Sequence, residues 1–327
     1  MTISTVARHA QVSRQTVSNV INSPHLVREE TRKRVEESIA ALGYRAHQAA
    51  RLMRTGRSRL IALRIEPTRD GINGSVLDRF LHGLTEAADA AGYRVMLYTA
   101  ADDAQEIAAF DALLGAYDLD AFVLTGTNHG DPRAAWLTAR KVPFVTFGRP
   151  WDSPERHPWV DVDGAAGTAQ ATRRLLDAGH RRIGFIGWPA GSGVGDDRRS
   201  GWAATVRAAG GDPTGLDRMT PDGVEEGGQA ARDLLALADP PTGLVCASDS
   251  LAFGALQVVR AARREVDVIG FDDTPVAQAV GLTSVSQPLG QAAASCVDLL
   301  VSLLDGDPVD QPSQVLLQPS LVIRQTV

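Results

Sequence analysis

The chain has 327 residues, 44% of them hydrophobic, with 33 Lys and Arg, 39 Asp and Glu and two cysteines. This composition is typical of a globular protein of two or three domains. The net charge of −6 argues at first against a nucleic-acid partner, but residues 1–59 hold 11 basic and 4 acidic residues (+7), which leaves 22 and 35 (−13) for residues 60–327. The basic amino-terminal segment therefore favours a polyanionic partner.

Several classes of protein are excluded by what the sequence lacks. The amino terminus has no apolar run behind a basic stretch, and no window approaches the roughly 18 apolar residues of a membrane span. We therefore expect a cytoplasmic protein without a membrane partner. Cys246 and Cys296 lie in apolar surroundings and are interpreted as reduced core thiols. No Cys/His cluster has zinc-ligand spacing, so no metal is expected.

Three short helices are predicted in residues 1–44. Ile3, Val6, Ala7 and Ala10 fall at helical spacing, Ser13 can cap a second helix, and a third runs from about Glu29 to Leu42, with Gly43 as its stop. Only about two residues separate the first two helices, which predicts that they cross steeply as a helix-turn-helix. Residues 45–59 can be helical but have little apolar surface of their own, so they indicate a linker that orders against a partner.

The second predicted helix has a polar face and an apolar face. Val17, Val20 and Ile21 form the apolar face. An Arg side chain can form two hydrogen bonds with guanine, Gln and Asn can do so with adenine, and Ser and Thr hydroxyls can bond to phosphates. This pattern in a basic segment favours DNA binding over a solvated bundle whose polar face has no role. The candidate DNA-binding residues of this helix are Ser13, Arg14, Gln15, Thr16, Ser18, Asn19 and Asn22.

From Leu60 onward, short apolar runs alternate with amphipathic stretches, a pattern that predicts a parallel α/β architecture with two Rossmann-like lobes and a cleft between them. The runs are LIALRI, RVMLYT, AFVLTG, FVTFG, WVDVD, RIGFIGW, GLVCAS and VDVIGF. The glycine run at 191–195 follows a strand in mid-chain and lacks the context of a dinucleotide fingerprint, so we expect a flexible loop at the mouth of the cleft. No hydrolase, P-loop or metalloprotease motif is present, and no enzyme or cofactor is expected.

Residues 3–53 resemble, helix by helix, the DNA-binding head of the lactose-repressor (LacI/GalR) family of bacterial transcription regulators. The body resembles the family through GHRRIGFIGWP (179–189), RRSGW (198–202), CASDSLAFGAL (246–256), VIGFDD (268–273) and LTSVSQP (282–288), in the family's order. The resemblance implies a helix-turn-helix head (1–59) and a two-lobed body of the type I periplasmic-binding-protein kind (60–327). The first lobe is expected at about 60–159 plus 289–318, and the second at about 160–288 plus 319–327.

The resemblance also implies roles in the head. Arg14, Gln15 and Asn19 match base-reading positions, and Tyr44 matches a position that packs beside the hinge. Ala50, Arg51, Leu52 and Met53 match the hinge helix (about 46–55), where Met53 replaces the leucine that wedges into the minor groove. Gln11 stands where the turn usually has glycine, so a non-glycine residue is expected at positive φ, and Arg28 replaces the usual capping serine of the third helix.

In the body, the resemblance and the predicted strand ends mark seven candidate effector-binding residues. An effector is a small molecule that changes DNA binding. Asp249 is expected to cap a helix or to contact the ligand, and Trp188 to stack on a sugar or to lie in the core. Ser248 replaces a usual asparagine, which leaves the ligand's identity open. The seven residues are Glu66, Trp188, Arg198, Ser248, Asp249, Asp272 and Gln287.

Together these observations predict a regulator, most simply a repressor that binds a palindromic double-stranded operator as a homodimer and is released by a sugar-like effector. A corepressor type, whose ligand strengthens DNA binding, remains open because the sequence does not set the sign of the coupling. A solute-binding protein of the same body fold would need a signal peptide and no basic head. No leucine heptad follows the body, which favours a dimer over a tetramer.

Overall fold

The computed structural model describes residues 1–44, 57–65, 71–152, 157–306 and 314–327, apart from the side chains of residues 22 and 73. By its contacts the chain divides into two units, 1–58 and 59–327. Each unit is described by itself. No helix within the described ranges has both the length and the hydropathy needed to cross a bilayer.

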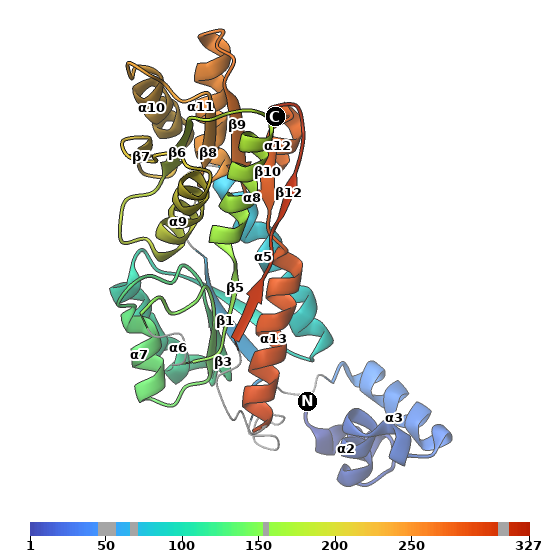
Figure 1. Cartoon of the computed structure of the whole chain (residues 1–327). Coiled ribbons are helices and arrows are strands. Elements are labelled where there is room, and N and C mark those ends of the chain that lie inside the picture. Colours follow the sequence, from blue (N-terminus) through green and yellow to red (C-terminus); the bar gives the residue numbers. More distant parts are fainter. Residues whose placement is uncertain (45–56, 66–70, 153–156, 307–313) are drawn as a thin grey trace. The chain divides into compact units, whose positions relative to one another are not determined.

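The amino-terminal unit is a small helical head (Figure 1). It consists of α1 (Ile3–His9), α2 (Arg14–Asn22), the 3-10 helix η1 (Pro24–Leu26) and α3 (Glu29–Leu42). Val6, Val17 and Val35 are completely buried between the helices and form the centre of its core. Four residues, two more than predicted, separate α1 from α2. Gln11 in this turn has φ 53°, which confirms the expected positive φ.

Local sequence signals set the ends of the head's helices. The hydroxyls of Thr2 and Ser13 accept hydrogen bonds from the backbone N–H groups of Thr5 and Thr16, which caps α1 and α2. Arg28 gives α3 no side-chain cap, as predicted, although Glu29 and Glu30 in its first turn face the positive end of the helix dipole. Gly43 ends α3 in the left-handed conformation, at φ 58°.

The first lobe of the body has one six-stranded parallel sheet in the order β11-β5-β4-β3-β1-β2. Successive residues of β1 point to opposite faces: Ile61 and Leu63 pack against α5 and α13, whereas Ala62 packs with the core that includes Phe110 of α6 and Leu137 of α7. The strands are β1 (Leu60–Ile65), β2 (Arg94–Thr99), β3 (Ala121–Leu124), β4 (Phe144–Phe147), β5 (Trp159–Val162) and β11 (Gln314–Leu317). The helices are α5 (Gly71–Ala90), α6 (Asp103–Tyr117), α7 (Pro132–Ala139) and α13 (Leu289–Asp305).

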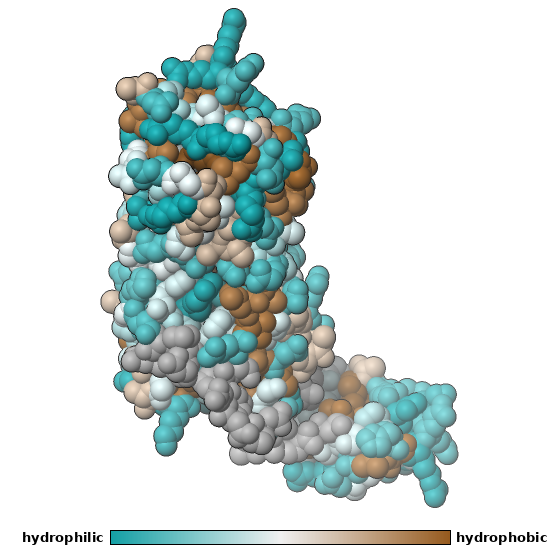
Figure 2. All heavy atoms as spheres, viewed as in Figure 1, coloured by the Kyte–Doolittle hydropathy of each residue, from teal (hydrophilic) through white to brown (hydrophobic). Residues whose placement is uncertain are grey.

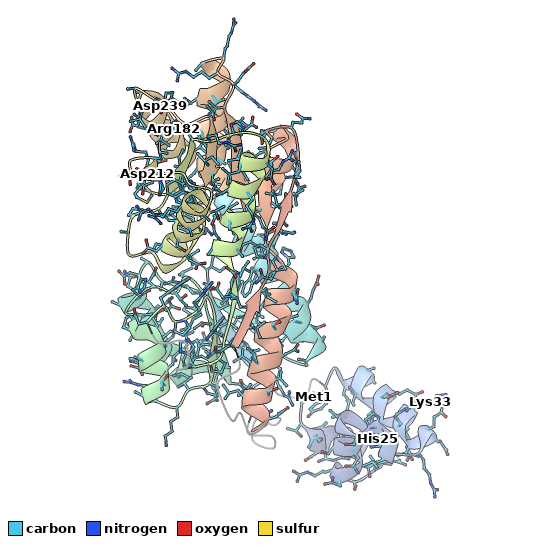
Figure 3. All side chains as sticks on the ribbon, viewed as in Figure 1. Met1, His25, Lys33, Arg182, Asp212 and Asp239 are labelled. Carbon is cyan, nitrogen blue, oxygen red and sulfur yellow. The ribbon has the colours of Figure 1, made fainter. Side chains whose placement is uncertain are left out.

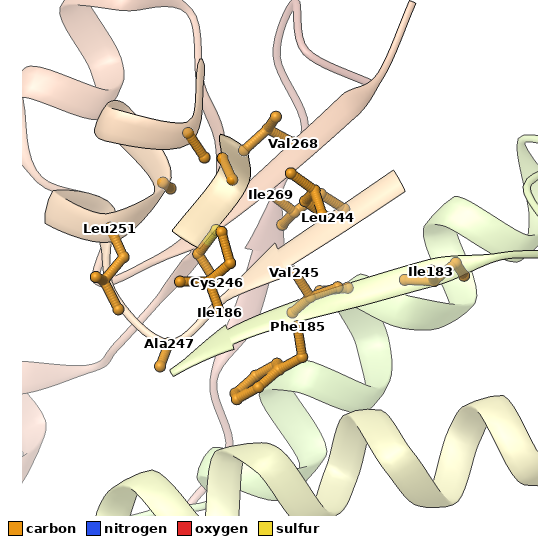
Figure 4. Close-up of a cluster of buried hydrophobic side chains, with 14 of the residues drawn as sticks. Ile183, Phe185, Ile186, Leu244, Val245, Cys246, Ala247, Leu251, Val268 and Ile269 are labelled. Carbon is orange, nitrogen blue, oxygen red and sulfur yellow. The ribbon is translucent and has the colours of Figure 1, made fainter. Parts of the chain in front are cut away.

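The second lobe has a six-stranded sheet in the order β12-β10-β9-β8-β6-β7, in which only β12 runs antiparallel to its neighbour. Its core joins the central strands to the covering helices, and Figure 4 shows part of it around Phe185 and Cys246. The strands are β6 (Ile183–Gly187), β7 (Asp217–Met219), β8 (Gly243–Cys246), β9 (Asp267–Phe271), β10 (Thr283–Ser286) and β12 (Ser320–Val322). The helices are α8 (Gly164–Asp177), α9 (Gly193–Ala208), α10 (Val224–Leu235), α11 (Asp249–Ala261) and α12 (Pro275–Val280).

The two lobes confirm the predicted fold class, and each of the eight apolar runs contains a strand. The chain passes between the lobes after β5, between β10 and α13, and between β11 and β12. Because β5 belongs to the first sheet, residues up to Val162 are part of the first lobe. Both cysteines are free and buried, as predicted.

The visible face of the molecule is mostly hydrophilic, with apolar residues in small groups (Figure 2). Figure 3 draws the side chains as sticks and labels six residues of the head and the second lobe. One labelled pair, Arg182 and Asp239, forms a surface salt bridge of 3.3 Å in the second lobe.

Candidate functional site

Helix α2 presents polar side chains on the face opposite to its buried valines. Arg14 and Gln15 are exposed, while Val17 and Val20 are buried. The amide of Gln15 donates to Oδ1 of Asn19 at 2.9 Å, so these two candidate base-reading side chains hold each other. The hydroxyls of Ser13 and Thr16 are also paired, at 2.9 Å. The arrangement gives one helix face a row of donors and acceptors of the kind that reads base edges.

The other candidate DNA-binding residues differ in how far the structure describes them. Ser18 is half-buried on α2, and Tyr44 packs against the core of the head. The side chain of Asn22 lies outside the described atoms. The predicted hinge residues Ala50, Arg51, Leu52 and Met53 lie outside the described residues, as does Glu66 of the body.

Six of the seven candidate effector residues lie at one edge of the second lobe. Trp188 follows β6, Ser248 and Asp249 follow β8, and Asp272 follows β9. Gln287 follows β10, and Arg198 lies on α9. Because β6, β8, β9 and β10 are parallel, their carboxyl ends meet at this edge. Open α/β sheets bind ligands at the carboxyl ends of their strands.

Arg198 is the centre of this edge. Its side chain is 7% exposed, and its Nη1 lies 3.6 Å from Oδ1 of Asp272. The guanidinium lies 3.7 Å from the ring centre of Phe271 and 5.1 Å from that of Trp188. Burial lowers the pKa of Arg198, and the carboxylates around it, Asp272 first, oppose that shift. Among the described residues, Nε of Arg198 and Nε1 of Trp188 are buried without a hydrogen-bond partner.

Asp272 is a buried carboxyl group in a strained turn. Burial raises its pKa to about 8. The negative charges of Asp249 and Asp222 also raise this pKa, whereas the positive charge of Arg198 lowers it. The amide of Gln287 donates to its Oδ1 at 2.6 Å. Asp272 and the next residue, Asp273, have φ values of 113° and 52°, which are costly for non-glycine residues.

Three residues hold this turn in place. Arg79 of the first lobe donates to the carbonyl oxygens of Asp272 and Asp273 at 3.2 and 3.4 Å. Arg324 pairs with the Asp273 carboxylate at 2.5 Å, and Ser284 accepts from the Asp273 N–H group at 3.0 Å. The Asp272 carboxyl therefore has a fixed position opposite Arg198.

The structure corrects the expected roles at the start of α11. Ser248, and not Asp249, is the N-cap: its hydroxyl accepts from the Leu251 N–H group at 3.2 Å and also bonds to Asp222. Asp249 is the first helical residue, 1% exposed, and its two oxygens accept from Thr274 N and Ser284 Oγ at 2.7 and 2.6 Å. Burial raises the pKa of Asp249 to about 6.

The prediction of a flexible glycine loop at 191–195 was wrong. Residues 193–195 form the first turn of α9, and Ser192 caps it by accepting from the Gly195 N–H group at 3.2 Å. Two first-lobe arginines were not predicted: Arg79, and Arg149, which lies 3.3 Å from Asp197 of α9. Arg149 follows β4, so the carboxyl-edge rule could have identified it. In the described parts of the chain, no three His, Cys, Asp or Glu residues are grouped so as to hold a metal ion.

Known proteins match both units of the chain. Residues 2–47 match the family "Bacterial regulatory proteins, lacI family", and residues 172–327 match the "Periplasmic binding protein-like domain". The transcriptional regulator CelR of Thermobifida fusca is 32% identical over 99% of this chain and 98% of its own length. The repressor CytR of Escherichia coli is 28% identical over 99% and 95%.

Solved structures agree with these matches. A CelR–cellobiose complex is 30% identical, with a TM-score of 0.76 and complete coverage of both chains. The lac repressor dimer bound to operator and an anti-inducer, at 24% identity, shares the fold, with a TM-score of 0.86 over 100% of this chain and 98% of that chain. The chain belongs to the lacI family and is a DNA-binding transcriptional regulator.

Proposed function

We propose that this regulator is a repressor that leaves its operator when a sugar or sugar derivative binds at the carboxyl edge of the second lobe. The observation that carries the proposal is the pair of buried N–H groups, Nε of Arg198 and Nε1 of Trp188, that have no partner among the described residues. A buried donor without a partner costs about 1–3 kcal/mol. An acceptor on a ligand would remove that cost.

The surroundings of these two donors favour a hydroxylated ligand. The neutral form of Asp272, kept at neutral pH by burial, can donate a hydrogen bond, and its charged form accepts from hydroxyls. The Trp188 ring offers an apolar face to the C–H side of a sugar ring. The CelR–cellobiose complex supports the same class of ligand for this chain. The finer roles of Ser248, Asp249 and Gln287 as ligand contacts remain part of the proposal.

On the DNA side, the proposal assigns base reading to Arg14, Gln15 and Asn19 of α2. One such helix reads too few base pairs for specificity in a genome, so a homodimer on a pseudo-palindromic operator is proposed. Ala50, Arg51 and Met53 are proposed to contact the minor groove between the half-sites. The structure of the lac repressor dimer on its operator supports this arrangement through its shared fold.

The competing function is that of a corepressor-type regulator, in which ligand strengthens operator binding. The two functions differ in the sign of one coupling free energy, so a single titration separates them. An operator is first selected from randomised duplexes. Its affinity is then measured by fluorescence anisotropy with and without each member of a sugar panel that includes cellobiose.

Weaker operator binding with sugar supports the repressor, and tighter binding supports the corepressor. If no sugar changes the affinity, the proposed ligand class is wrong. Arg198→Ala should keep operator binding and lose the sugar effect, because it removes the buried guanidinium. Arg199→Ala is the matched control: the neighbouring arginine is 49% exposed and pairs with Asp217 at the surface, so its removal should leave both properties unchanged. A normal sugar response of Arg198→Ala would contradict the assignment.

A further inference from the structure

The amino-terminal turn of α9 lies directly against a tryptophan of the first lobe. A Cβ atom on Gly193 would lie 2.3 Å from Cε2 and Nε1 of Trp151. Real Cβ atoms do not approach other atoms so closely, so only glycine allows this contact. Gly193 is not one of the described glycines with a positive φ. A glycine is therefore needed here for the close approach of Trp151 and not for its backbone conformation.

Trp151 is held rigidly within its own lobe. It lies in the loop after β4, in which Gly148 has φ 117° and packs so closely on Thr127 that a Cβ atom would lie 2.3 Å from the Thr127 hydroxyl oxygen. That hydroxyl donates to the Arg149 carbonyl oxygen at 3.0 Å, and the indole N–H group of Trp151 donates to the Thr127 carbonyl oxygen at 3.1 Å. The loop therefore presents Trp151 and Arg149 in fixed positions.

Arg149 makes a second connection between the lobes. Its Nε donates to Asp161 of the first lobe at 2.6 Å, and its Nη2 donates to Asp197 of α9 at 3.3 Å. The guanidinium lies 4.8 Å from the ring centre of Trp151, so the two side chains also contact each other. The carboxylates of Asp161 and Asp197 are 9% and 15% exposed, which limits the screening of this pair by water.

We propose that Trp151 and Arg149 form a clasp that holds the first lobe on the amino-terminal turn of α9 and so positions Arg198. Asp197 and Arg198 are neighbours in that helix. Separation of the lobes would move Arg198 away from every ligand contact that the first lobe supplies. The clasp therefore sets the fraction of molecules whose lobes are together, and with it the apparent affinity for effector. This last consequence rests on the proposed function, whereas the clasp itself does not.

The test measures the distance between the lobes in the full chain. Cysteines that replace Ala139 and Ala208, the exposed last residues of α7 and α9, carry spin labels, and the two native cysteines are buried. Gly193→Ala should shift the main distance to longer values and broaden it. Gly115→Ala is the matched control, because a Cβ atom there, in the last turn of α6, would meet no atom within 4 Å. It should leave the distribution unchanged.

Two further variants keep the test decisive if Gly193→Ala is poorly folded. Trp151→Ala removes the atoms with which the new Cβ collides, so Gly193→Ala should cause no additional shift in that background. Asp197→Asn should shift the distance in the same direction as Gly193→Ala, because it removes the charge opposite Arg149. Unchanged distances in Gly193→Ala and Asp197→Asn, or additive shifts in the double variant, would overturn the clasp.

A cellobiose titration of the same labelled proteins separates this proposal from the proposed function. If the clasp variants lengthen the distance and weaken the cellobiose effect, both proposals are supported. If they lengthen the distance but no sugar affects the wild type, the clasp stands and the proposed ligand class fails. If sugar acts on the wild type and the distances do not change in the variants, the clasp fails alone.

Discussion

Asp272 should make the protein less stable as the pH rises from about 4 to about 8. Burial raises the pKa of this carboxyl from 3.8 to about 8 in the folded state. Between these two values the folded protein keeps a proton that the unfolded chain has released, so the free energy of unfolding falls as the pH rises. The stabilisation is complete below the unfolded pKa and is lost as the pH rises through the folded pKa.

The magnitude follows from the size of the shift. Each pH unit within this range changes the free energy of unfolding by about 1.4 kcal/mol for one such group, so the whole range corresponds to about 6 kcal/mol as an upper limit. Asp249 contributes with the same sign over a narrower range, because burial raises its pKa to about 6. The decline should therefore be steepest between the ordinary carboxyl pKa and about pH 6, where both groups contribute.

Asp272→Asn isolates the contribution of this one carboxyl. The amide oxygen of asparagine can still accept from Gln287, but the side chain no longer titrates. Urea unfolding of both proteins at several values between about pH 5 and pH 8 should give a stability difference that changes by about 1 kcal/mol per pH unit. Asp212→Asn is the control, because Asp212 is at the surface (Figure 3) and hydrogen bonds from Thr214 lower the pKa of its carboxyl below this range.

Parallel stability curves for the wild type and Asp272→Asn would refute this reasoning. They would mean that Asp272 is ionised in the folded protein throughout the range and that Arg198 outweighs the effect of burial. The Asp212→Asn curve should be parallel to the wild type in either case.

Two further predictions concern the first lobe and the head. Glu106 is completely buried between Arg64 and Arg133, at 2.7 and 2.8 Å, and accepts from the Tyr98 hydroxyl at 2.8 Å. Glu106→Gln should lower the free energy of unfolding by about 3–5 kcal/mol. Asp89→Asn, which removes a charge from an exposed pair with Arg94, should lower it by less than about 1 kcal/mol. Similar losses for the two variants in urea unfolding would contradict this prediction. Ser13→Ala and Thr2→Ala should each destabilise the head by about 1 kcal/mol through a lost cap. Only Ser13→Ala should also weaken operator binding in a gel-shift titration, because only α2 carries the proposed DNA-reading face. Equal operator affinity of the two variants would count against that face.

Most of the strands that sequence reasoning identified are largely buried, and β2, an edge strand with exposed residues, was identified as well. A parallel strand covered by helices is a continuous apolar run, so β3 and β8, buried at every residue, are visible in the sequence. Four strands, β7, β10, β11 and β12, were not among the predicted runs. Of these, β7 and β12 are three residues long and only partly buried. β7 and β12 lie at the two edges of their sheet. Each is a strand because it pairs with a neighbouring strand, and no local sequence pattern encodes that pairing.

The candidate site also contains residues that could be predicted from the sequence and residues that could not. Residues at strand ends, such as Asp272, could be placed from sequence because strand order brings these ends together. The local prediction at Gln11 was also confirmed, since a turn is set by its own residues. Gly193 was misinterpreted because a glycine required for close approach has the same sequence signal as one required for flexibility. Arg149 was missed because a single arginine in a loop has no spacing pattern, and only its place after β4 could have identified it.

The late position of β11 and β12 has a consequence for synthesis. Each sheet receives a strand from residues 314–322, so neither lobe has all its strands until the ribosome has translated nearly the whole body. Helices α1 to α3 are contiguous and form a separate unit that is translated first. A nascent chain therefore completes the part that meets DNA long before the part that senses a ligand. A body truncated before β11 would lack a strand in both lobes at once, so a late nonsense mutation should produce a head without a working sensor.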